Sequence, residues 1–330
     1  MSKNETKKIT SIGGRALIEG IMMRGPKKST VAVRTPNSEI YTEDVDIKFL
    51  SQSSKFWRLP LIRGVSGMID SMRLSYKSLM ISANKAMEGI DEEEEEKEPG
   101  KFEKWLTEKF GDKIMKILMI FSTLIGVALA VLLFFFLPTW IFGLLGLAFP
   151  ALNGGANESI AFWQSVIEGI LKIAIFISYI LIVSMTPDMK RVFQYHGAEH
   201  KTIFCYEKEL ELTPENVMKQ RRFHPRCGTS FILLMLLVGI IIGLFIPKGV
   251  FLRPLIKILL LPVTMGIGYE LIKFCGKHDN IVTRIIAAPG LWAQRITTKE
   301  PDEKMCEVAI KAIEAVIPDD GSDIVKNGCC

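Results

Sequence analysis

Four apolar segments constrain the fold of this chain more than any other feature. A transmembrane helix needs about 20 mostly apolar residues, and the first segment, Ile117–Leu137, contains no ionisable side chain. The second segment includes Glu168 and Lys172, which are four residues apart and can pair on one helical face. The four segments cover residues 117–137, 161–185, 229–247 and 254–272. We therefore predict a mainly α polytopic membrane protein with about four transmembrane helices.

The fourth segment leaves two interpretations open. Lys257 and Glu270 lie near its ends, and Pro262 interrupts it. It is either a complete span or one half of a re-entrant hairpin formed with the third segment. The apolar segment WIFGLLGLAFPALNGG, which follows the first span, is too short for a further span, so we expect an interfacial or re-entrant piece there.

The distribution of Lys and Arg predicts the orientation of the spans. The 41 basic residues exceed the 36 acidic ones for a net charge of +5, which does not by itself indicate nucleic-acid binding. Five lysines lie between residues 101 and 116 and eight basic residues between 188 and 228, whereas residues 138–159 have none. Because basic loops are retained in the cytoplasm, we expect both termini and the central loop to be cytoplasmic.

Polar regions surround the predicted spans. Residues 29–47 alternate apolar and polar side chains around PNSE, which predicts a β-hairpin, and GGRALIEGIMMRGP before it is a strand or a loop. Residues 61–87 have helical periodicity, and this helix lies on the membrane surface or packs on its own domain. The predicted order is a small mixed α/β cytoplasmic N-terminal region at 1–90, an acidic linker at 91–100, a first transmembrane pair at 101–185, a cytoplasmic loop at 186–228, a second transmembrane pair at 229–272, and a cytoplasmic tail with an amphipathic helix at 273–330.

Histidines are rare in this chain and concentrate in the central loop. The chain has four, and three of them, His196, His200 and His224, lie in that loop. The segment YHGAEHK matches H-x-x-E-H, the reversed form of the zinc-protease signature. On a helix, His196 and His200 project from one face and can share a metal ion. In that chemistry the metal lowers the pKa of a water, and a carboxylate, here Glu199, takes its proton.

A metal site of this kind needs a third protein ligand. The residues within reach by sequence are His224, Cys227, Glu270, His278 and Asp279. We predict a divalent-metal site, with Zn as the ion, formed by His196, His200 and either His224 or Cys227. The competing interpretation is a layer of hydrogen-bonded polar side chains beside the membrane. Gly197 also disfavours a rigid helix, by about 1 kcal/mol relative to Ala.

Six ordered motifs resemble one bacterial family. They are GGRALIEGIMMRGP, LIRGVSGMIDS, YHGAEHKTIFCYE, FHPRCGTSF, GYELIKFCGKHDN and APGLWAQRITTKEPDE, and together they extend from about Ile9 to Ile317. The chain is similar to the YqhQ-like membrane proteins, a family described as metal-dependent but without an established activity. The resemblance implies a multi-pass protein of the bacterial plasma membrane. It carries the metal assignment only onto the matching residues His196, Glu199, His200, His224 and Cys227.

Two functions from different classes follow from these observations. The first is an integral membrane, metal-dependent hydrolase, such as a peptidase, with Glu199 as the catalytic base. The second is a non-enzymatic scaffold or regulator of a bacterial membrane protein complex. In both cases the lipid bilayer is an expected partner, and a membrane protein or a second copy of this chain is a further one. We expect no nucleic acid among the partners.

Overall fold

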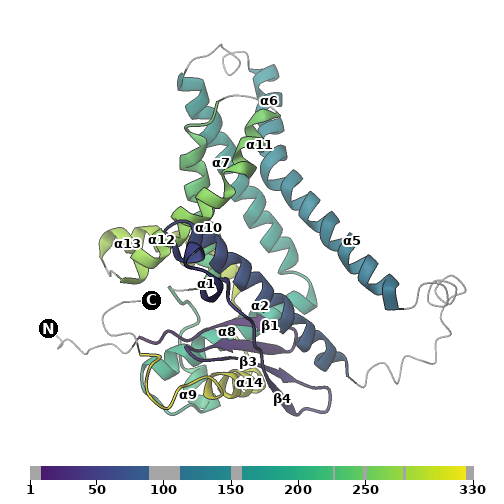
Figure 1. Ribbon diagram of the computed structural model, residues 1–330, viewed down its shortest axis with the longest axis vertical. Coiled ribbons are helices and arrows are strands. Elements are labelled where there is room, and N and C mark those ends of the chain that lie inside the picture. The colour runs from purple at the N-terminus through teal and green to yellow at the C-terminus, as the bar shows by residue number, and fades with distance from the viewer. Residues whose placement is uncertain are drawn as a thin grey trace, which may run out of the picture. The chain divides into compact units, whose positions relative to one another are not determined.

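The computed structural model describes residues 9–88, 112–149, 158–225, 227–247, 251–277 and 280–324 (Figure 1). The chain divides into two compact units. The first unit comprises residues 1–88, 177–238 and 262–330, and the second comprises residues 89–176 and 239–261. The predicted acidic linker at 91–100 lies outside the described residues.

The first unit contains a four-stranded antiparallel sheet. Its strands are β1 (Gly13–Leu17), β2 (Gly20–Arg24), β3 (Ser29–Arg34) and β4 (Ile40–Asp44), in the spatial order β1-β2-β3-β4. The predicted hairpin over 29–47 is confirmed as β3 and β4. GGRALIEGIMMRGP, which the sequence left as a strand or a loop, forms a second hairpin that turns at Glu19, whose φ is +49°. The N-terminal region is thus a β-meander.

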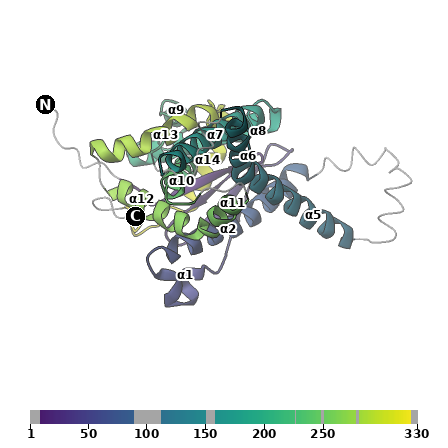
Figure 2. The same cartoon turned by 90° about the horizontal axis from the view of Figure 1, so that it is seen from above.

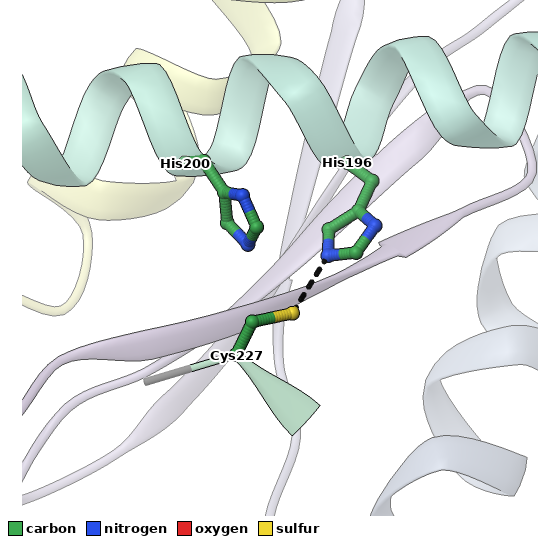
Figure 3. A group of neighbouring side chains, drawn as sticks. All are labelled: His196, His200 and Cys227. Carbon is green, nitrogen blue, oxygen red and sulfur yellow. Dashed lines mark hydrogen bonds between the residues drawn. The ribbon is translucent and has the colours of Figure 1, made fainter. Parts of the chain in front are cut away.

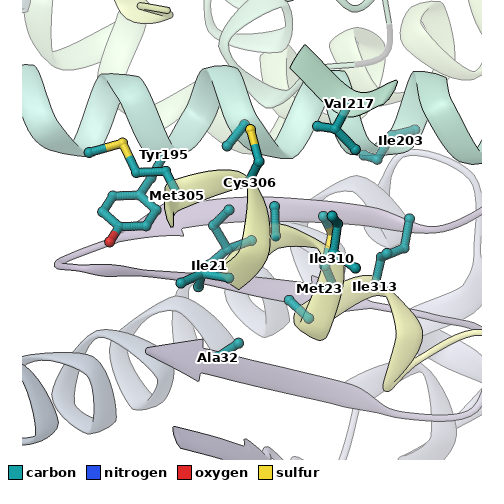
Figure 4. Close-up of a cluster of buried hydrophobic side chains, with 14 of the residues drawn as sticks. Ile21, Met23, Ala32, Tyr195, Ile203, Val217, Met305, Cys306, Ile310 and Ile313 are labelled. Atoms are coloured by element: carbon teal, nitrogen blue, oxygen red, sulfur yellow. The ribbon is translucent and has the colours of Figure 1, made fainter. Parts of the chain in front are cut away.

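Helices cover both faces of this sheet. The strands lie between α2 (Ile62–Met87) on one side and α8 (Pro187–Glu207) and α14 (Glu303–Glu314) on the other (Figure 1, Figure 2). Because side chains alternate across a strand, Ile21 and Met23 enter the core beneath α8 and α14 (Figure 4), whereas Met22 packs toward Leu74 of α2. The nearly continuous apolar sequence of β2 reflects this burial on both faces.

The helix predicted over 61–87 is α2, and its inner face packs on its own domain. Leu74, Ser78 and Ser82 are buried, and the Ser82 hydroxyl donates to the carbonyl of Ile18. The short helices α1 (Leu50–Ser53) and η1 (Lys55–Arg58) precede it. The first unit is completed by α9 (Pro214–Met218), α12 (Leu261–Lys277) and α13 (Ile281–Thr297).

The amphipathic helix predicted in the C-terminal tail is α14. Asp302 caps it, because the Asp302 carboxylate accepts a hydrogen bond from the backbone N–H of Met305 at 2.8 Å. Loss of such a cap typically costs about 1 kcal/mol. We expect Asp302→Ala to lower the free energy of unfolding by that amount, measured by thermal unfolding of the detergent-solubilised protein. Asp302→Asn, which retains a capping oxygen, should stay close to the wild type, and an equal loss in both variants would contradict the cap.

The first apolar segment continues further than the sequence indicated. Helix α5 (Asp112–Val131) leads through a π-helical turn, η2 (Leu132–Phe136), into α6 (Leu137–Ala148). The prediction of a separate interfacial or re-entrant piece at WIFGLLGLAFP was therefore wrong for its described part. Pro138 lacks an N–H, and the wider preceding turn, in which the Leu137 N–H donates to the Leu132 carbonyl, allows the helix to continue through it.

Fewer of the described helices are long and apolar enough to cross a membrane than the sequence suggested. Among the described residues, two helical stretches are long and apolar enough to cross a membrane, Phe121–Ala148 and Phe162–Val183 within α7 (Glu158–Val183). A third is added if α11 (Leu252–Leu259) and α12 count as one span, with a bend of 50° between them. The apolar part of α10 (Gly228–Gly243) is only Ser230–Gly243. The expectation of about four spans is not confirmed, because α10 is short and the last apolar segment is bent.

Candidate metal centre

Helix α8 places the two histidines of the H-x-x-E-H motif on one face. The helix runs without interruption from Pro187 to Glu207, so His196 and His200 are one turn apart and their ring centroids are 4.4 Å apart. His200 is 1% exposed, and the His196 side chain is 12% exposed. The local sequence therefore delivers two imidazoles to the same buried position.

Cys227 completes a group of three metal-ligating side chains. It precedes α10, and its Sγ lies 3.2 Å from His196 Nε2 (Figure 3). One potential ligand atom from each of His196, His200 and Cys227 lies within 4.8 Å of the others. Two imidazole nitrogens and a thiolate form a donor set that Zn²⁺ prefers, with bonds of about 2.0–2.1 Å to nitrogen and 2.3 Å to sulfur. The donors present therefore suit a divalent ion of this type.

Backbone carbonyls orient both imidazoles. His196 Nδ1 donates to the carbonyl of Thr297 at 2.8 Å, and His200 Nδ1 donates to the carbonyl of Arg222. With the proton on Nδ1, each Nε2 carries a lone pair that is directed toward Cys227. Among the described residues, His200 Nε2 is buried and has no hydrogen-bond partner. A metal-bound histidine usually donates a hydrogen bond from the ring nitrogen that does not bind the metal. A buried ring nitrogen without a hydrogen-bond partner is rare, and it indicates that a partner such as a metal ion is missing.

Glu199 lies beside the ligands and is held by the sheet. Its Oε1 accepts a hydrogen bond from the Gly14 N–H of β1 at 3.0 Å. Its Oε2 is buried, has no hydrogen-bond partner in the described part of the chain, and lies 4.0 Å from His196 Nε2. Burial raises the pKa of Glu199, and His196, the Gly14 N–H and Arg15 oppose that shift. One carboxylate oxygen is thus fixed by the backbone and the other faces the histidines.

Of the other ligands considered from the sequence, the described ones, His224 and Glu270, lie outside this group. The His224 ring is 5.5 Å from that of His200 and 4.8 Å from that of Phe204, and its Nε2 is 4.0 Å from Glu207 Oε2. Glu270 forms an ion pair with Arg63 of α2. His278 and Asp279 lie outside the described residues. Of the two third ligands favoured by the sequence, the structure brings Cys227 into the group.

Comparison with known proteins identifies the family. A family model described as "Protein of unknown function (DUF1385)" matches residues 59–319. The chain belongs to this family. It is also 33% identical over 326 residues, 96% of this chain and 95% of the relative, to the "Uncharacterized protein YqhQ" of Bacillus subtilis (strain 168). No solved structure matches the chain. The expected YqhQ-like family is confirmed, and neither description assigns an activity or a metal.

Gly197 has a specific role in this member of the DUF1385 family. A Cβ at this position would lie 2.0 Å from the carbonyl oxygen of Lys299. The Lys299 N–H also donates to the Phe193 carbonyl at 2.8 Å, so the 298–301 segment packs directly on the α8 backbone. The sequence suggested that Gly197 weakens a helical site. In the structure it permits a close approach that brings the Thr297 carbonyl to His196.

The groups that orient the ligands could not be recognised in the sequence. They are the carbonyls of Arg222 and Thr297 and the N–H of Gly14, and every residue type other than proline offers both such groups. Gln294 is a further example. Its Oε1 accepts a hydrogen bond from the His224 N–H at 2.8 Å, and its Nε2 donates to the His224 carbonyl at 2.7 Å. Only Gly197, a glycine between two histidines in a helical pattern, carried a signal of close backbone contact.

Proposed function

We propose that this chain is an integral membrane protein of the bacterial plasma membrane that binds one divalent metal ion, Zn²⁺, through His196, His200 and Cys227. We place both termini and the metal centre on the cytoplasmic side, in line with the basic central loop. The observation that carries the proposal is the convergence of the three ligand atoms within 4.8 Å. We propose no role in nucleic-acid binding.

We further propose that the centre hydrolyses a peptide or related bond near the membrane. A divalent ion at this site would act as a Lewis acid and lower the pKa of a water to near neutrality. Three protein ligands with one open position are typical of catalytic zinc sites. Glu199 is the general base, because Oε2 faces the histidines without a partner and is available to take the proton of that water. The Gly14 N–H prevents the carboxylate from rotating away.

A non-enzymatic scaffold is the second candidate, and burial favours it. Glu199, His200 and Cys227 are 4%, 1% and 8% exposed, which leaves little access for a substrate. A closed four-coordinate centre would be structural, with Glu199 as its fourth ligand. It would fix α8 to the segment before α10 and to the end of α13, and the protein would recruit a membrane partner or a second copy of itself.

The two functions differ in whether the ion has an exchangeable coordination position. We expect Co²⁺-substituted protein in detergent to change its visible d–d absorption when acetohydroxamate is added, with saturation. Glu199→Gln should keep Co²⁺ at the wild-type stoichiometry, and any turnover of fluorescein-labelled casein should fall by about 10²–10⁴-fold in this variant. An unchanged spectrum together with Co²⁺ loss in Glu199→Gln would contradict hydrolysis and support the closed centre.

A further inference from the structure

A second group of ionisable side chains is buried in the second unit. Glu168 of α7 is 1% exposed. Its Oε2 accepts hydrogen bonds from Arg253 Nε at 3.1 Å and from the Lys257 ammonium, and its Oε1 accepts from the Gln164 amide at 2.9 Å. The sequence favoured a pair between Glu168 and Lys172. The structure instead pairs Glu168 with two residues of α11.

All the N–H donors of the Arg253 guanidinium form hydrogen bonds within the protein. It is 0% exposed, and its remaining donors contact Ser165 Oγ at 2.6 Å and the carbonyls of Gly243, Ile246 and Pro247. These carbonyls lie at and just after the C-terminal end of α10, where the helix dipole is negative. Arg253 therefore satisfies Glu168 and the end of α10, and it has no donor left for a ligand.

Two lysines leave this cluster with an excess of positive charge. Lys257 is 8% exposed, and within the described part of the chain it contributes one hydrogen bond, to Glu168. Lys172 is half-buried, and its Nζ lies 5.2 Å from the centroid of the Phe135 ring. Among the described residues, Lys172 forms no ion pair within 4.0 Å, and Glu168 is the carboxylate paired with Lys257. Three basic side chains thus share one carboxylate in an apolar part of the chain.

The charge of the cluster indicates the chemistry of a ligand. The formal sum of Lys172, Arg253, Lys257 and Glu168 is +2, and the α10 terminus offsets only about half a charge. An uncompensated buried charge costs several kcal/mol, so an anion of charge −1 or −2 would stabilise the cluster. The basic residues with unused donors are both lysines, which bind phosphate as compact point charges, whereas bidentate carboxylate recognition favours arginine.

We propose that Lys172 and Lys257 form a phosphate-binding site in the second unit, with Arg253 and Glu168 positioning Lys257. Two sources can supply the phosphate, a phospholipid headgroup or free inorganic phosphate. The site is independent of the proposed metal centre, since none of its residues is a metal ligand.

The test uses the full chain, purified in a phosphate-free maltoside detergent and titrated at constant ionic strength. The probes are dihexanoylphosphatidylglycerol, inorganic phosphate and uncharged dihexanoylglycerol, and calorimetry gives the Kd of each. We expect saturable binding of at least one phosphate probe, with no comparable binding of dihexanoylglycerol. Preference for the phosphatidylglycerol identifies a headgroup site, and equal or tighter binding of inorganic phosphate identifies a free-phosphate site.

Matched variants assign the binding to this cluster. Lys172→Met keeps the length of the side chain and removes its charge, so it should weaken binding about tenfold or more, as loss of a charge-assisted hydrogen bond would. Its thermal midpoint without ligand should equal or exceed that of the wild type, because an uncompensated charge is removed. The exposed Lys190→Met variant is the control and should keep the wild-type Kd. Absence of saturable phosphate binding, equal binding of dihexanoylglycerol, or wild-type affinity in Lys172→Met would overturn the proposal.

Discussion

We expect His200→Asn to abolish binding of the metal ion that we propose for this protein. The asparagine amide can replace Nδ1 as the donor to the Arg222 carbonyl, but it offers nothing at the position of Nε2, the buried nitrogen that lacks a partner. Loss of an outer hydrogen-bond partner typically costs 10–100-fold in metal affinity. We expect loss of a ligand to exceed about 100-fold and to reduce the metal content from about one ion per chain to a small fraction. The measurement is elemental analysis of the purified protein.

His224→Asn is the matched control for this experiment. His224 is buried next to His200, with ring centroids 5.5 Å apart, but it lies outside the three-residue group. We expect this variant to retain its metal, and any loss of metal affinity should stay within the 10–100-fold that is typical when an outer hydrogen-bond partner is removed. Metal retained in His200→Asn and lost in His224→Asn would contradict the ligand set and restore His224 as the third ligand.

Gly197→Ala will destabilise the protein even though alanine is the better helix former. Helix propensity alone would favour alanine by about 1 kcal/mol. The new Cβ, however, would lie 2.0 Å from the Lys299 carbonyl oxygen. The α8 backbone fixes the position of a Cβ and the oxygen is itself a backbone atom, so no side-chain rotation relieves the contact. Overpacking of a filled position costs about 1–3 kcal/mol. Because a 2.0 Å contact lies at the upper end of that range, we expect a net loss of about 2 kcal/mol and a thermal midpoint lower by about 4 °C or more.

Gly126→Ala provides the opposite case in the same chain. Gly126 is also in the interior of a helix, α5, and a Cβ there has no atom within 4 Å. We expect this variant to unfold at or above the wild-type temperature. A Gly197→Ala variant as stable as wild type would show that the 298–301 segment does not pack on α8 as described.

The local parts of the fold were predictable because short-range patterns determine them. Alternation around PNSE predicted the β3–β4 hairpin, and periodicity predicted α2 and α14. The four-residue spacing of His196 and His200 predicted their common face on a helix. Each of these features depends on residues close in the sequence, whose geometry follows from the period of a strand or a helix.

The remaining features depend on contacts between distant residues. The choice of Cys227 over His224 is decided by the path of the chain before α10, and two residues only three apart there reach different surroundings. Glu168 has a lysine four residues away, but its partner Arg253 is 85 residues away. The sequence identified the residues that can act as metal ligands or hydrogen-bond donors, but it did not show which of them lie close together in the fold.

The most direct test of the proposed metal centre is Zn K-edge X-ray absorption of the purified wild-type protein. The ligand set predicts one sulfur at about 2.3 Å and two imidazole nitrogens at about 2.0–2.1 Å, with the remaining coordination supplied by oxygen. Cys227→Ser should remove the sulfur contribution. A first shell of oxygen alone, or protein that binds no zinc with all three side chains intact, would contradict the metal centre.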